Sequence, residues 1–233
     1  FLDSSAEVTL AVLQPEGIQR LFLPIDPAEG EAISPFLVTA AINALQPDYW
    51  QSPGYDSTTL TDPTPLTIAE RLVSDLLLWQ EAASERKAWR MHILARQITL
   101  EYGRDRVLEW YLNSADFGHG AFGAEAAAQL YLQKPASQLT LGEAAFLTAL
   151  LRTPALNPLD TQMEPLELMQ PVLEELAQAG LIQARDVQDA LAAPLLLNTD
   201  PAQIDPPLPA IARVILQQLV STFGSERLRR GGL

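Results

Sequence analysis

Residues 107–158 read VLEWYLNSADFGHGAFGAEAAAQLYLQKPASQLTLGEAAFLTALLRTPALNP, and this stretch decides the fold. Helical patterns cover residues 105–113 and 121–132, on either side of a glycine-rich turn. Thr140 followed by Glu143 is a capping-box pattern, which predicts that a further helix begins there. The stretch therefore predicts helices joined by short turns.

The flanking sequence is also mostly helical in pattern. Ser34 can cap a helix whose first residue is Pro35, and Gly103 and Gly180 are placed to end two later helices. The further helices are expected over residues 67–79, 84–102, 164–179 and 206–226. Strands and helices do not alternate, so a doubly wound sheet is not expected.

Two apolar runs near the start, EVTLAVL and RLFLPI, flank the turn-like QPEG and predict paired strands. Residues 53–66 are rich in Gly, Pro, Thr and Asp, which predicts a loop. We therefore expect a mainly α fold with a small N-terminal β element. The expected parts are this β element over 1–33, a main helical domain over 34–200, and a C-terminal helix with the start of a linker over 201–233.

The composition excludes several classes of function. The chain has 233 residues, 48% of them hydrophobic, which is enough to bury a sizeable core. Its net charge of −14 disfavours binding to nucleic acid and to anionic lipid surfaces. There is no cysteine, and His92 and His119 are the two histidines, so neither a thiolate metal site nor a multi-histidine zinc site is expected. No apolar run approaches the ~18 residues of a membrane-spanning helix.

The opening stretch contains five blocks in a fixed order: VLEWYLN, FGHGAFG, GAEAAAQLYLQK, LTLGEAAFLT and PALNP. In this order they resemble the later part of the peptidoglycan glycosyltransferase domain of glycosyltransferase family 51, the lipid II polymerase of class A penicillin-binding proteins. Residues 37–56, 66–78 and 84–98 resemble the first, second and third motif regions of that family. The resemblance implies a lysozyme-like glycosyltransferase fold over 34–200 and a transpeptidase domain that follows residue 233.

The family joins the 4-hydroxyl of one lipid-linked disaccharide to the anomeric carbon of another. A carboxylate must take the hydroxyl proton as general base, and cations must balance the charge that grows on the pyrophosphate leaving group. The resemblance therefore directs attention to the positions of the two family glutamates.

The first motif keeps the family's spacing but not its reacting groups. Counting back from Gly54, Ser52 stands at the histidine and Tyr49 at the aromatic residue. Gln46 and Leu45 then stand at the aspartate and the glutamate of the family's ED pair. Leucine cannot accept a proton, and loss of a general base lowers the rate by roughly 10²–10⁴.

The second and third motifs are also altered. The family's STITQQ corresponds to LTIAER at 66–71, which retains Thr67 and Ile68, and its later lysine and asparagine correspond to Ser74 and Asp75. In the family's RK-x-x-E, the basic pair is matched by residues 86 and 87. This register puts Arg90 at the glutamate, whereas counting back from residue 113 puts Met91 there. Neither residue is a carboxylate.

Two other carboxylates are candidates for the lost base. Asp48 lies three residues after the lost glutamate position, and Glu70 lies in the second motif. The alternative interpretation is structural: a solvated loop acid at Asp48 and an exposed helix acid at Glu70. The same acids would be needed for a third, weaker hypothesis, a lysozyme-like hydrolase.

Basic residues gather in the third motif. Arg86, Lys87 and Arg90, together with Thr67, are candidate remnants of a phosphate and sugar groove, and the alternative is a solvated helix face. His92 is expected to be packed or at the surface rather than catalytic. The tryptophans are expected in the core or lining the groove: Trp50, Trp79, Trp89 and Trp110.

The resulting hypothesis is a degenerate, non-catalytic family-51 domain that acts as a scaffold, binds a partner, or binds lipid II or glycan weakly. The alternative is an active polymerase with relocated carboxylates. By resemblance, we expect the extracytoplasmic face of the bacterial membrane, a membrane tether outside this segment, and partners among cell-wall synthesis proteins. No cofactor is expected, although the family resemblance allows Mg²⁺.

Overall fold

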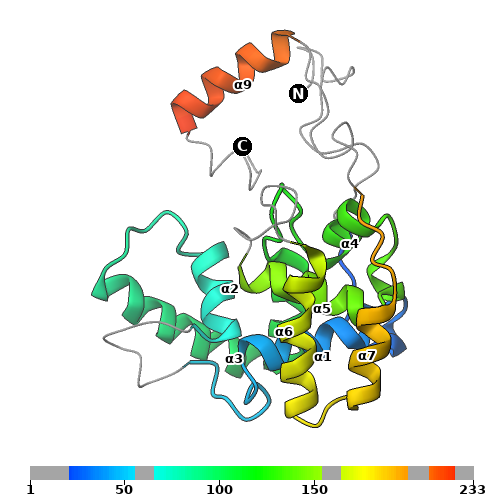
Figure 1. The fold of residues 1–233 in the computed structure, drawn as a ribbon. Helices are drawn as coiled ribbons and strands as arrows, with labels where there is room; N and C mark the ends of the chain where they lie inside the picture. The colour runs from blue at the N-terminus through cyan, green and yellow to red at the C-terminus, as the bar shows by residue number, and fades with distance from the viewer. Residues whose placement is uncertain (1–20, 56–65, 154–163, 199–209, 224–233) are drawn as a thin grey trace.

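The computed structural model describes residues 21–55, 66–153, 164–198 and 210–223, and these form a predominantly helical structure (Figure 1). The α-helices are α1 (Pro35–Leu45), α2 (Ile68–Leu76), α3 (Glu85–Ser114), α4 (Ala124–Leu132), α5 (Leu141–Arg152), α6 (Pro165–Gln178), α7 (Ala184–Ala192) and α9 (Ala210–Phe223). Two single-turn 3₁₀ helices are η1 (Pro27–Glu29) and η3 (Ala136–Gln138). The mainly α fold expected from the sequence is confirmed.

The starts of the helices follow from local sequence. Pro35 is the first residue of α1, as its fixed φ angle favours. In α5, the Thr140 hydroxyl accepts from the Glu143 N–H while the Glu143 carboxylate accepts from the Thr140 N–H, which forms the expected capping box. Gly180 follows α6 in a left-handed conformation with φ 73°, as expected for a helix stop.

The long helix α3 is interrupted at Gly103, which has φ 80° and ψ 164°. This left-handed geometry is open to glycine at little steric cost. Helical geometry resumes directly after it, so the two expected helices meet end to end with no loop between them. The helix α7 was not expected, because its nine residues contain few large apolar side chains.

The expected N-terminal β element is not seen. Its first run lies outside the described residues, and the described residues 21–25 contain no strand. The Asn113 side chain occupies the place of a partner strand here: Leu23 N–H donates to its Oδ1 at 2.8 Å, and its Nδ2 donates to the Leu23 carbonyl at 2.8 Å. Because a side-chain amide satisfies the backbone of Leu23, this segment docks on α3 without a strand pair.

The core is centred on α5, which packs against α1, α4, α6 and α7 (Figure 1). Residues 144–151 of α5 are all buried. A second packing unit is formed by α2 against α3. The largest fully buried side chains are Tyr131, Phe117, Phe146, Ile33, Leu37, Ile68, Leu78, Leu108, Leu112, Leu130, Leu147 and Leu150. Each such side chain contributes roughly 1.5–3 kcal/mol through removal of apolar surface from water.

The glycine-rich turn between α3 and α4 has a steric explanation. Gly123 has φ +91°, and a Cβ placed on it would lie 2.5 Å from the backbone oxygen of Asn113. Its N–H donates to the Ala115 carbonyl at 2.8 Å, which closes the turn. The spacing from Asn113 to Gly123 in the quoted stretch is therefore a requirement of this close backbone approach.

Candidate functional site

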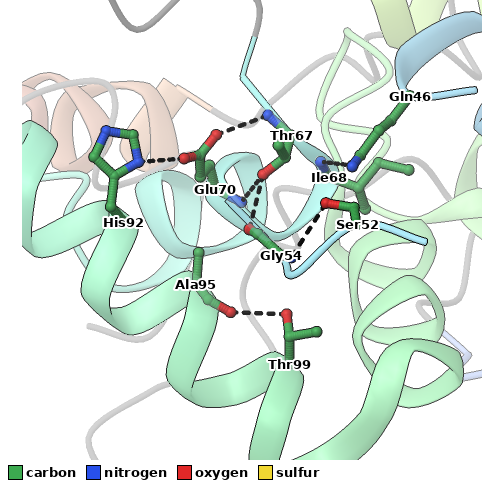
Figure 2. Close-up of polar contacts among 9 residues, drawn as sticks. All are labelled: Gln46, Ser52, Gly54, Thr67, Ile68, Glu70, His92, Ala95 and Thr99. Carbon is green, nitrogen blue, oxygen red and sulfur yellow. Dashed lines mark hydrogen bonds and ion pairs between the residues drawn. The ribbon is translucent and has the colours of Figure 1, made fainter. Parts of the chain in front are cut away.

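Segments of all three motif regions meet at the N-terminus of α2 (Figure 2). The loop after α1 provides the first motif, α2 and its cap provide the second, and α3 provides the third. We call the side chains and the glycine that meet here the polar cluster: Gln46, Ser52, Gly54, Thr67, Glu70 and His92.

Thr67 joins the first motif to the second. Its hydroxyl donates to the Gly54 carbonyl at 3.0 Å and accepts from the Glu70 N–H at 3.2 Å. One residue later, the Ile68 N–H donates to Oε1 of Gln46 at 3.0 Å. Two of the free N–H groups at the start of α2 are therefore satisfied by side chains, and the loop after α1 is held against this helix.

Gly54 lies directly against α3. Its φ is +92°, and a Cβ on it would meet the Thr99 hydroxyl oxygen at 2.2 Å and the Ala95 carbonyl oxygen at 3.0 Å. Its N–H donates to the Ser52 hydroxyl at 3.2 Å. The position therefore requires glycine for both its conformation and its packing.

Glu70 is fully buried, with 0% of its surface exposed. The expectation of an exposed helix acid is therefore wrong. Its Oε2 accepts from the Thr67 N–H at 2.9 Å, and its Oε1 contacts Nδ1 of His92 on α3 (Figure 2). The capping box turns the side chain back along α2, and the packing of α3 then covers it.

His92 is 4% exposed, which agrees with the expectation of a packed residue. Its Nδ1 pairs with Glu70, and its Nε2 is buried with no hydrogen-bond partner among the described residues. The ring also meets Tyr55 edge-on, with centroids 6.3 Å apart. The pair joins α2 to α3 across a region from which water is excluded.

The residues that the sequence analysis aligned with the family acids have ordinary structural surroundings. Leu45 is half-buried at the end of α1 and packs against the core. Met91 is buried in the core, while Arg90 is exposed and forms an ion pair with Glu81. Asp48 is exposed in the turn after α1, where its backbone carbonyl accepts from two following N–H groups. In the third motif, the two residues aligned with the family glutamate are Arg90 and Met91, and neither is a carboxylate.

The candidate groove residues divide between two environments. Thr67 is 7% exposed inside the polar cluster. Arg86 is exposed and Lys87 half-buried in the first turns of α3. Trp50 and Trp89 are 44% and 54% exposed, so neither lies in the core.

The sequence analysis did not identify the contribution of Arg104. Its guanidinium donates to the Ser52 carbonyl from Nε at 2.9 Å and from Nη2 at 2.6 Å. The Tyr49 hydroxyl donates to the Arg104 carbonyl at 2.7 Å, and burial is the main cause that raises the pKa of this phenol well above its usual value. The only local signal was its position after Gly103, which does not indicate a partner 52 residues away.

The described residues contain no group of three or more His, Asp or Glu side chains that could hold a metal ion. These residues therefore offer no ligand set for the Mg²⁺ that the family resemblance allows. In the described residues, no helix is both long enough and apolar enough to cross a bilayer.

Residues 66–177 match the family model described as Transglycosylase, and this part of the chain belongs to that family. The chain is similar to part of penicillin-binding proteins 1A from several bacteria.

The chain is also similar to individual proteins and to a solved structure. Penicillin-binding protein 1A of Rickettsia typhi is 27% identical over 232 residues, which covers 92% of this chain and 29% of that protein. Its counterpart in Aquifex aeolicus is 30% identical over 198 residues, 79% of this chain and 26% of that protein. The crystal structure of penicillin-binding protein 1A from Haemophilus influenzae matches with a TM-score of 0.41 and 23% identity, over 68% of this chain and 20% of that one. The chain thus spans less than a third of the length of these proteins.

Proposed function

We propose that this chain is a degenerate, non-catalytic peptidoglycan glycosyltransferase domain with a scaffold or binding role in cell-wall synthesis. The observation that carries the proposal is the absence of a carboxylate at both family positions. Leu45 stands at the first, and Arg90 or Met91 stands at the second. By the same resemblance, the domain would work at the extracytoplasmic face of the bacterial membrane, tethered by a segment outside the chain.

Glu70 does not restore the missing base. A general base must come within hydrogen-bond reach of the substrate hydroxyl, roughly 2.6–3.2 Å. Glu70 is fully buried, and its two carboxylate oxygens are engaged by the Thr67 N–H and by His92. Freeing this carboxylate would expose buried donors, so its role is to hold the start of α2.

Asp48 is the observation that favours the alternative, an active polymerase with a relocated base. Its side chain is exposed, and it lies in the turn directly after Leu45. An exposed carboxylate in this turn is free to meet a substrate hydroxyl. Among the described residues, however, no basic side chain of the third motif pairs with Asp48. The cations that must balance the charge on the pyrophosphate leaving group are therefore not found beside this carboxylate.

A lipid II polymerisation assay on the full-length protein tests the proposal. Purified lipid II is supplied, and the glycan products are separated by length, with an active lipid II polymerase as the positive control. We expect no glycan chains from this protein. Robust chain formation would overturn the proposal, and its loss in Asp48→Asn but not in Glu70→Gln would identify the relocated base.

The binding role needs its own measurement. Arg86 and Lys87 are the candidate phosphate contacts, and Thr67 is the candidate sugar contact retained from the second motif. Titration with a soluble lipid II analogue should show weak binding that Arg86→Ala reduces. An unchanged affinity in that variant would remove these residues from the site and leave a scaffold role alone.

A further inference from the structure

Glu70 on α2 and His92 on α3 form a buried acid–histidine pair (Figure 2). Glu70 is 0% and His92 4% exposed, so water does not reach the contact between them. The pair joins the second motif to the third, because one member lies at the start of α2 and the other on α3. Both side chains can gain a proton, so the proton content of the pair affects how the two helices are held together.

The hydrogen bonds of Glu70 determine which nitrogen of His92 carries a proton. The Thr67 N–H donates to Oε2 of Glu70 at 2.9 Å, and Nδ1 of His92 contacts Oε1. The start of α2 is the positive end of that helix, which favours an ionised carboxylate there. An ionised carboxylate only accepts, so Nδ1 of His92 must donate. The other ring nitrogen, Nε2, is buried and has no hydrogen-bond partner among the described residues.

An additional proton has no acceptor in this arrangement. On Nε2 it would create a buried N–H donor that no described residue accepts. On Glu70 it would create an O–H that faces a donor at either oxygen, unless the ring changes to the Nε2–H form and leaves the same N–H unpaired. A charged His92 would be attracted to Glu70, but it would lose its hydration in the buried site, and the Thr67 N–H and the helix start already compensate the carboxylate.

The groups around the ring supply no second acid. From the loop before α2, Tyr55 meets the ring edge-on with centroids 6.3 Å apart. On α2, Arg71 follows Glu70, and its Nε donates to a backbone carbonyl of its own segment at 3.2 Å. On α3, Arg96 lies about one turn after His92 and is exposed. Within the described residues, Glu70 is therefore the one carboxylate paired with this ring.

We propose that the Glu70–His92 pair is an acid-sensitive latch between α2 and α3. At neutral pH, His92 is uncharged and donates from Nδ1 to the ionised Glu70, and the latch is closed. In acid, the ring takes up a proton from solvent at Nε2, which is favourable only where that N–H meets water, so the contact opens and the start of α2 separates from α3.

The sign of the pH dependence follows from the proton count. The closed latch contributes stability above about pH 6.5, where histidine titrates in an unfolded chain, and this contribution is lost as the pH falls below that value. The latch goes beyond the proposed function, because it does not depend on whether the domain is catalytic. At the extracytoplasmic face proposed above, it would respond to the pH outside the cell.

Nuclear magnetic resonance of the imidazole nitrogens tests the closed state. The chain has two histidines, so His119→Gln leaves the signals of His92 alone in the spectrum. We expect a neutral His92 ring at about pH 7, with its proton on Nδ1. A charged ring at that pH, or a proton on Nε2 alone, would overturn the proposal.

Urea unfolding of the 233-residue chain between about pH 7 and pH 5 tests the opening. His92→Gln keeps an N–H for Glu70 but does not titrate, and His119→Gln is the matched control. One proton changes the unfolding equilibrium by up to about tenfold per pH unit, so the parent chain should shift towards the unfolded state at least about fivefold more than His92→Gln. His119→Gln should follow the parent chain.

Peptide-level hydrogen exchange locates the opening. After correction for the intrinsic effect of pH, residues 67–76 of the parent chain should lose protection in acid before α5 does. An equal pH dependence in the parent chain and His92→Gln, or unchanged protection of residues 67–76, would contradict the latch. A parent chain that becomes more stable than His92→Gln in acid would replace it with a charged ion pair. The resonance and exchange measurements need no change at His92, so they decide the matter even if His92→Gln does not fold.

Discussion

Replacing Glu70 with alanine removes the carboxylate that links the start of α2 to α3. Its two oxygens accept from the Thr67 N–H at 2.9 Å and contact Nδ1 of His92. All three residues are buried, so water does not readily replace either bond. The substitution therefore leaves two donors without acceptors inside the protein.

The structure sets the size of the expected effect. A buried donor left without a partner costs roughly 1–3 kcal/mol, so two of them predict a loss of about 2–6 kcal/mol in the free energy of unfolding. Glu70→Gln should lose less, about 1–2 kcal/mol, because its amide keeps an oxygen for Thr67 and offers an N–H to His92. A matched surface control is Glu81→Ala, which breaks an exposed ion pair with Arg90 and should cost at most about 1 kcal/mol.

Urea unfolding followed by circular dichroism at helical wavelengths measures these free energies for the parent chain and the three variants. The slope against urea must stay constant for the comparison to report stability alone. A loss in Glu70→Ala no larger than that in Glu81→Ala would refute the structural role of Glu70. It would then restore this acid as a candidate base.

Three further outcomes are expected. Gly123→Ala should lose roughly 3 kcal/mol in urea unfolding, because its Cβ would lie 2.5 Å from the Asn113 oxygen at φ +91°. Gly120→Ala, which meets no atom within 4 Å, should lose only about 1 kcal/mol, and equal losses would contradict the close-approach argument. Asn113→Ala should speed hydrogen exchange at the Leu23 amide, and unchanged exchange would show that the segment is held otherwise. Burial alone would raise the pKa of Glu143, but hydrogen bonds from a lysine and a threonine outweigh it and lower the pKa. Its contribution should therefore be present above the unfolded value of about 4.3 and be lost as the pH falls through the folded value, so Glu143→Gln should differ from the parent at pH 7 and converge with it in acid.

The features that the sequence predicted well are those encoded by a few adjacent residues. The Pro35 start, the capping box at Thr140 and the breaks at Gly103 and Gly180 each depend on one or two local conformational preferences. The α7 helix was missed because its nine residues contain few large apolar side chains, and in the structure it packs against α6. Local helix propensity is a weak predictor where tertiary packing determines whether a segment becomes helical.

The candidate site was predicted less completely, because its contacts join residues far apart in the chain. Glu70 was expected as an exposed helix acid because carboxylates are seldom buried, yet it is buried against α3, where its partner His92 lies 22 residues away in the sequence. Arg104 and Ser52 are 52 residues apart. Trp89 was expected in the core or lining the groove, and it is 54% exposed, because the side of a helix that is buried depends on which neighbour packs against it.

The residues that identify the family have structural roles that do not depend on activity. Thr67 caps α2 and holds the first-motif loop, and Gly54 allows that loop to reach α3. Asn113 holds the backbone of Leu23, and Gly123 closes the turn into α4. A domain that lost catalysis would still need each of them to fold. Their presence therefore supports ancestry and fold equally in an active and an inactive member. The positions that would separate the two cases are those where only the chemistry requires a carboxylate, and the proposed alignment puts Leu45 and either Arg90 or Met91 there.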